Sequence, residues 1–131
     1  MRVIFLRCIA VGLAGSVGAA ARYLIGLLFG LLNVRFPLGT MFINLSGSLF
    51  LGWFLTYIAG RHVSDATRLG IAVGFVGAYT TFSTFMYESV KLIDEGAHIE
   101  GMVNIMASLL LGLAAVQCGM WLGGYGLARR P

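Results

Sequence analysis

The residues of this sequence that are best suited to chemistry lie in one run, residues 74–85, within a long apolar segment. Two glycines in the run can open a helix, and four hydroxyl side chains follow in the five positions from Thr80 to Thr84. Hydroxyl hydrogens suit an anion, whereas backbone carbonyls freed by an opened turn suit a monovalent cation such as sodium. A membrane helix has little reason to gather such groups unless a polar species binds or passes there. The run therefore indicates ion binding.

A helix that resumes after such a break divides its side chains between two faces. Thr81, Thr84 and Glu88 share one face, at spacings of three and four residues. Phe82 and Phe85 share a neighbouring face, and the electropositive edges of their rings can lie against an anion. The alternative is structural, because hydroxyl side chains also bond back to helix carbonyls and phenylalanines also face lipid.

Polar side chains recur at helical spacing in two other apolar segments. Asn44 lies midway along one of them, four residues after Thr40. A buried Asn amide needs hydrogen-bond partners, so it either joins two helices or donates to a bound anion. Asn104 and Ser108 repeat the spacing in the last segment, and the same two interpretations apply to them.

Arg22 and Glu88 are the ionisable side chains that lie deepest in apolar segments. Charged groups at membrane depth are costly and are functional hypotheses by default. Arg22 can draw anions into a vestibule or extend to the membrane surface, and Glu88 can pair with a hydroxyl or a cation; a structural ion pair is the alternative. The sequence has no HExxH, GxSxG or P-loop motif and no pair of carboxylates beside a nucleophile, so we do not expect an enzyme.

The elements that must position these residues are membrane helices. Of the 131 residues only 11% are charged, against about 25% in soluble proteins. Four apolar segments reach the length of about 20 residues that crosses a bilayer. They run over residues 3–32, 38–59, 66–93 and 99–127, and the third is interrupted within residues 77–81. The sequence thus predicts an all-α membrane protein with one domain, residues 1–131, and a broken third transmembrane helix.

The two ends of the chain raise separate questions. The first twenty residues resemble a signal peptide, but the apolar run continues to Leu32, so we expect a retained span; a mature N-terminus near Ala21 would contradict this. Basic residues number six on the side of both termini and three elsewhere, which favours cytoplasmic termini. The six are Arg2, Arg7, Arg61, Arg68, Arg129 and Arg130, and the three are Arg22, Arg35 and Lys91. Their scatter argues against nucleic acid as a partner.

Three motifs resemble the Fluc (CrcB) family of fluoride channels, over nearly the whole chain. They are Gly-Ser-Val-Gly-Ala-Ala-Ala-Arg-Tyr at residues 15–23, Pro-Leu-Gly-Thr at residues 37–40 leading to Asn44, and Gly-Ala-Tyr-Thr-Thr-Phe-Ser-Thr-Phe at residues 77–85. The last motif is highly specific in a chain this short with four spans.

The resemblance implies an antiparallel, dual-topology homodimer in the bacterial inner membrane that lets fluoride leave the cell passively through two pores. It implies a structural sodium ion at the dimer centre, held by backbone carbonyls of Gly77 and Thr80 from both copies. It assigns the fluoride pathway to Asn44 as amide donor, Phe82 and Phe85 as an aromatic box, Thr40, Ser83, Thr84 and Glu88 as a polar track, Ser108 on the fourth helix, and Arg22 at a vestibule. Fluoride, a second copy of the chain and membrane lipid are the implied partners.

Three features depart from the family pattern. Met86 stands where Ser is common, and Asn104 stands where an aromatic residue or His is common. The bias of basic residues also leaves room for a single orientation paired with an oppositely oriented paralogue.

Two other functions remain open: a small multidrug-resistance-type proton antiporter, which would need a carboxylate in the first helix where Arg22 stands, and a non-conducting assembly subunit.

Overall fold

The computed structural model describes residues 1–128, with side chains through Gly124; Arg129 and Arg130, which entered the orientation argument, lie outside the described residues. Over this part the chain is helical and has four candidate membrane spans. The spans begin and end within two residues of the predicted limits, as their apolar lengths require. The helices are α1 (Arg2–Gly30), α2 (Leu38–Ile58), α3 (Asp65–Leu69), the π-helix η1 (Gly70–Val76), α4 (Gly77–Tyr79), α5 (Phe82–Asp94) and α6 (His98–Ala128).

The sequence fixes the ends of these helices through local signals. Pro37 immediately precedes α2, where a missing N–H is tolerated. The Ser64 hydroxyl caps α3 by accepting the Thr67 N–H at 3.1 Å. Gly96 follows α5 with a φ of +82°, a left-handed conformation that glycine adopts without a steric penalty.

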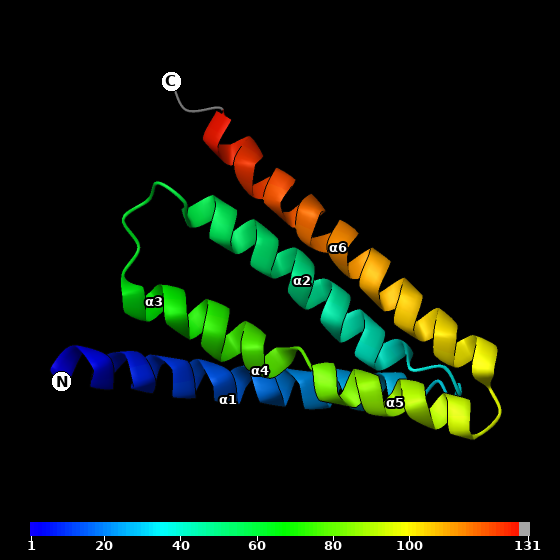
Figure 1. Ribbon diagram of the computed structural model, residues 1–131. Coiled ribbons are helices and arrows are strands. Elements are labelled where there is room, and N and C mark those ends of the chain that lie inside the picture. Colours follow the sequence, from blue (N-terminus) through cyan, green and yellow to red (C-terminus); the bar gives the residue numbers. More distant parts are fainter. Residues whose placement is uncertain (129–131) are drawn as a thin grey trace.

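The helices are arranged as two pairs, which Figure 1 shows from the side. In one pair α1 packs against α3, η1 and α4; in the other α2 packs along α6, and α5 contacts α6. Glycines make both pairs close. A Cβ at Gly119 would lie 2.1 Å from the Leu49 carbonyl oxygen, and one at Gly74 would lie 2.5 Å from that of Val11. Small residues at these contacts let helix backbones approach, as is usual in membrane bundles.

The third span is broken as predicted, but the break is narrower and is not at the glycines. Only Thr80 and Thr81 are extended, with ψ of 157° and 113° respectively. Gly77 remains helical and begins α4, and Gly74 lies inside η1. The physical reason is that extended backbone suits β-branched threonine, and the N–H and carbonyl of Thr81 both find a partner outside the helix.

Candidate functional site

The break is held by the side chain of Asn44, which reaches it from α2. Asn44 Oδ1 accepts the Thr81 N–H at 2.8 Å, and Asn44 Nδ2 donates to the Thr81 carbonyl at 3.0 Å. One amide thereby satisfies both backbone groups of an extended residue at membrane depth, where unpaired groups are costly. Asn44 therefore joins α2 to the third span, as the first of the two interpretations of this residue expects. An amide NH2 has two hydrogens, so one Nδ2 hydrogen remains for another acceptor.

The same arrangement diverts two N–H groups from their usual helical acceptors. The Thr81 N–H, which a continuous helix would donate to the Gly77 carbonyl, goes to Asn44 instead. The Thr84 N–H, which would go to the Thr80 carbonyl, is accepted by Thr81 Oγ1 at 3.2 Å. The carbonyls of Gly77 and Thr80 thus lose their i+4 donors. These two residues are the ones to which the family resemblance assigns sodium.

On one side of the break lies an open groove that we call the phenylalanine groove, with a volume of about 460 Å³. The rings of Phe82 and Phe85 lie together there, with centroids 6.1 Å apart. Phe82 is 74% exposed, so the groove opens onto the surface of the subunit. None of the described residues that line it is charged. The polar ones are Asn44, Ser48, Thr80, Thr81 and Ser108, and the others besides the two phenylalanines are aliphatic or glycine.

Behind the phenylalanine groove, hydrogen bonds connect α5 to α6. Ser89 donates to the Phe85 carbonyl at 2.7 Å and accepts from Asn104 Nδ2 at 2.8 Å. Ser108 contacts Asn104 Oδ1 at 3.5 Å. Ser89 and Asn104 are almost completely buried, at 0% and 1% exposure, and neither lines the groove. Asn104 therefore joins two helices beside the groove.

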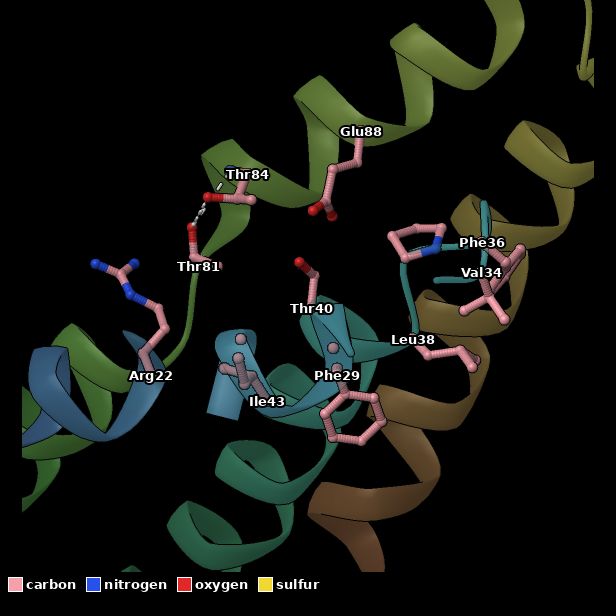
Figure 2. Close-up of a pocket in the computed structure, with 14 residues that line it drawn as sticks. Arg22, Phe29, Val34, Phe36, Leu38, Thr40, Ile43, Thr81, Thr84 and Glu88 are labelled. Atoms are coloured by element: carbon pink, nitrogen blue, oxygen red, sulfur yellow. Dashed lines mark hydrogen bonds between the residues drawn. The ribbon is translucent and has the colours of Figure 1, made fainter. Parts of the chain in front are cut away.

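On the other side of the break lies a second cavity of about 380 Å³, which we call the glutamate cavity. Figure 2 shows Glu88 of α5 and Thr40 of α2 facing each other across it, with Arg22 of α1 extending beside Thr81. Glu88 Oε2 is inaccessible to solvent and has no hydrogen-bond partner within the described part of the chain. Thr84, also on the wall, contacts Thr81 Oγ1 at 2.9 Å. This cavity, unlike the groove, holds charges of both signs.

The predicted site residues are thus brought together in two groups and not in one. Thr81 lines both spaces and joins them. Ser83 and Gly77 line neither, although both are exposed on the subunit. The groove receives Asn44, Phe82, Phe85, Ser108 and Thr80, and the cavity receives Arg22, Thr40, Thr84 and Glu88.

Two polar contacts near the site were not anticipated from the sequence. Ser46 and the Tyr79 hydroxyl lie 2.9 Å apart and give α2 a second connection to the third span. Ser89 was overlooked as the partner of Asn104. Ser89 could have been found, because it follows Phe85 by one helical turn. The contact between Ser46 and Tyr79 had no local signal, because it depends on how two helices meet.

Comparison with known proteins gives a consistent result. The family described as "CrcB-like protein, Camphor Resistance (CrcB)" matches residues 9–120. A "Fluoride-specific ion channel FluC" of Acidobacterium capsulatum is 44% identical over 115 residues, covering 86% of this chain and 92% of the relative. "Fluoride-specific ion channel FluC 1" of Nitrobacter hamburgensis is 42% identical over 122 residues, covering 92% and 95%. A FluC of Methylococcus capsulatus is 42% identical over 95% of this chain, which spans only 54% of that relative.

Proposed function

Since the chain belongs to the CrcB family of fluoride-specific ion channels, which are proteins of the cell membrane and not enzymes, we propose that it conducts fluoride passively out of the bacterial cell. The observation that carries the proposal is the phenylalanine groove, whose described lining offers hydroxyl and amide groups and two aromatic rings but no charge. The family match also argues against the proton antiporter and against a non-conducting subunit.

Fluoride explains why such a lining is useful. Moving an isolated small ion into an apolar medium costs tens of kcal/mol in the Born limit, so a route must replace the hydration shell. It must also release the ion, which requires many weak contacts and not one strong contact. The free Asn44 hydrogen, the Ser108 hydroxyl and the ring edges of Phe82 and Phe85 supply weak, neutral contacts of this kind. A fixed cation in the groove would bind fluoride and slow its release.

The route has two sections in our proposal. The glutamate cavity leads from one membrane face to the break, with Arg22 attracting anions into a vestibule and Thr40, Thr84 and Glu88 along its wall. Thr81 lies between the sections because it lines both. The groove then carries fluoride past the two phenylalanines. Ser83 joins the route only if a second subunit covers the face on which it is exposed.

We further propose an antiparallel homodimer with sodium at its centre. The dimer is supported by the open groove and by the 74% exposure of Phe82, which a second copy would cover. The sodium is supported by the donor set, because the carbonyls of Gly77 and Thr80 have lost their helical donors and carbonyl oxygens suit a hard cation. When bound, sodium would supply a positive charge that holds the two breaks together.

Fluoride efflux from liposomes tests the proposal directly. Purified protein is reconstituted in liposomes loaded with potassium fluoride or potassium chloride, and anion release is followed with an ion-selective electrode after a potassium ionophore is added. We expect rapid fluoride release, no chloride release above empty liposomes, and no need for a pH gradient. Equal release of both halides, or release only under a pH gradient, would refute a passive fluoride channel.

A further inference from the structure

A third cavity lies far from the break, where α2 ends and α3 begins, and we call it the basic pocket. It has a volume of about 390 Å³ and lies at the end of the molecule where Figure 1 also shows the N-terminus. No residue of the fluoride route lines it. Its polar wall consists of Arg61, Asp65 and Arg68, and Leu55, Ile58 and Val63 contribute apolar surface.

The basic pocket has more positive than negative charge. Asp65 forms ion pairs with both Arg7 and Arg68, the latter at 3.3 Å. One carboxylate therefore serves two guanidinium groups. Arg61 has no carboxylate partner among the residues that the structure describes. The lining of the pocket carries two arginines and one aspartate, so it retains one net positive charge for a ligand, and Arg7 adds a further positive charge beside Asp65.

Arg61 is also held in a defined position. Its guanidinium carbon lies 3.4 Å from the centroid of the Tyr57 ring, which is a cation–π contact. Its Nε is shielded from solvent and has no hydrogen-bond partner in the described chain. A guanidinium stacked on a ring has its face covered, while its N–H groups project from the edge. That edge matches two oxygens of a phosphate, and stacking lowers the entropic cost of forming both bonds.

The apolar wall indicates where the phosphate comes from. Leu55 is 43% exposed and lies on α2 within the membrane span, six residues before Arg61, which follows the end of the helix. Tyr57 stacks on Trp53 at 5.3 Å, and such aromatic pairs gather at the level of lipid headgroups. A free phosphate ion would use only the arginines. A phospholipid would use both walls, with its headgroup at Arg61 and Arg68 and an acyl chain along Leu55 and Ile58.

We propose that the basic pocket binds the headgroup phosphate of an anionic phospholipid through Arg61 and Arg68. This binding is separate from ion conduction and does not rest on it. This net positive charge favours a headgroup with an uncompensated negative charge, such as phosphatidylglycerol, over the zwitterionic phosphatidylcholine.

Short-chain lipids test the choice of ligand with the unmodified protein. The full-length protein in a neutral detergent is titrated with dihexanoyl-phosphatidylglycerol, dihexanoyl-phosphatidylcholine or inorganic phosphate, and the midpoint of thermal unfolding is measured, because a ligand of the folded state raises it. We expect a saturable rise with phosphatidylglycerol alone. An equal rise with phosphatidylcholine would overturn the role of headgroup charge. An equal rise with inorganic phosphate would show a free-anion site and overturn the lipid.

Substitutions test the site. We expect Arg61→Gln to weaken the apparent affinity for phosphatidylglycerol about tenfold, which corresponds to one lost charge-assisted contact. Arg61→Lys should recover little of that loss, because an ammonium neither stacks nor donates in pairs. Arg2→Gln removes the same charge from the same end of the molecule, outside the basic pocket, and should bind normally.

The remaining outcomes are also decisive. Equal weakening in Arg61→Gln and Arg2→Gln would indicate general surface charge and overturn the pocket. If Arg61→Gln does not fold, Arg68→Gln replaces it, with the same expectation and the same control. Fluoride flux of Arg61→Gln in phosphatidylcholine liposomes should equal that of the wild type. The lipid site and the fluoride route therefore succeed or fail independently.

Discussion

The phenylalanine groove and the glutamate cavity lie on opposite sides of one two-residue break, yet they differ in chemistry. The described lining of the groove is neutral, with two aromatic rings at its open side. The cavity contains Arg22 and Glu88 and is enclosed by parts of α1, α2 and α5. Both spaces use α2 and α5, to which the cavity adds α1 and the groove adds α6. Thr40 and Asn44 of α2 face different spaces, as do Thr84 and Phe85 of α5.

This contrast shows how a short chain can keep two tasks apart. Attraction of an anion requires a positive charge nearby, whereas rapid passage of the anion requires a pore lining without fixed charge. Thr84 and Phe85 are adjacent on α5 and point in different directions, so a single helix can serve both requirements. The extended residues Thr80 and Thr81 set the direction of α5 relative to α4. In the proposed route, the break therefore places charge before the narrow section and keeps it out of the section itself.

The largest change in fluoride flux is expected from Asn44→Asp, which brings a charge into the neutral groove. An ionised carboxylate would repel both fluoride and the Thr81 carbonyl, to which Asn44 Nδ2 now donates. We expect fluoride flux to fall to the level of empty liposomes. The free energy of unfolding should also fall by about 1–3 kcal/mol, because the Thr81 carbonyl is left without a hydrogen-bond donor. Efflux and thermal unfolding measure the two consequences.

Ser46→Ala is the matched control for Asn44. Ser46 also connects α2 to the third span, through the Tyr79 hydroxyl at 2.9 Å, but it lines neither space. Its flux should stay close to that of the wild type. Unchanged conduction by Asn44→Asp at neutral pH would remove Asn44 from the route, and a block by Ser46→Ala would show that any loss of helix contact stops conduction.

The next effect concerns the aromatic side of the groove. Phe82→Ile and Phe85→Ile keep apolar bulk and remove the ring edges that face the anion. Fluoride flux should fall at least about tenfold in each variant, since a loss of roughly 1.4 kcal/mol of stabilisation along the route is a factor of ten in rate. Phe5→Ile, on the exposed part of α1, should conduct normally. Wild-type flux in both groove variants would refute the aromatic box, provided that size-exclusion chromatography shows an intact assembly.

Much of the arrangement compared above could be predicted from the sequence, because membrane helices are recognised from local apolar length and local capping residues. Apolar length gave the four spans, and Ser64 and Gly96 gave helix ends by their own chemistry. The separation of Thr84 from Phe85 followed from helical spacing alone. The sequence placed the break within residues 77–81 but did not narrow it to Thr80 and Thr81, because its place within that range depends on a partner. Thr81 is extended where Asn44 supplies its hydrogen bonds, and no rule of local propensity states that two distant residues meet.

A smaller effect is expected on the charged side of the break. Arg22→Gln removes a charge that attracts anions into the glutamate cavity without entering the groove. Fluoride flux should be about threefold below that of the wild type at low ionic strength, and the difference should shrink as salt is added, because the wild type loses its attraction for anions as the Debye length contracts from about 30 Å at 0.01 M to about 10 Å at 0.1 M. The deficit of the phenylalanine variants relative to the wild type should not shrink in this way. Arg2→Gln serves as the charge control, and a salt-independent loss for Arg22→Gln would place this side chain in direct contact with the ion.

The smallest effect on flux is expected from Asn104→Leu, although its effect on stability is not small. Asn104 lies beside the groove without lining it, and its Nδ2 donates to the fully buried Ser89. Loss of this contact between α5 and α6 should lower the free energy of unfolding by about 1–3 kcal/mol. Flux per folded protein should stay within about twofold, because the Ser108 hydroxyl released from Asn104 Oδ1 becomes free to donate into the groove.

Gln117→Leu is the matched control for Asn104→Leu, because it makes the same kind of change on an exposed part of α6. It should alter neither stability nor flux.

Asn44 and Asn104 show two uses of a buried amide. Asn44 bonds to the break and keeps one hydrogen for an ion, whereas Asn104 is enclosed between helices and holds them together. A fall in flux for Asn104→Leu as deep as that of Phe85→Ile, with the assembly intact, would mean that the ion depends on the network behind the groove as much as on its walls.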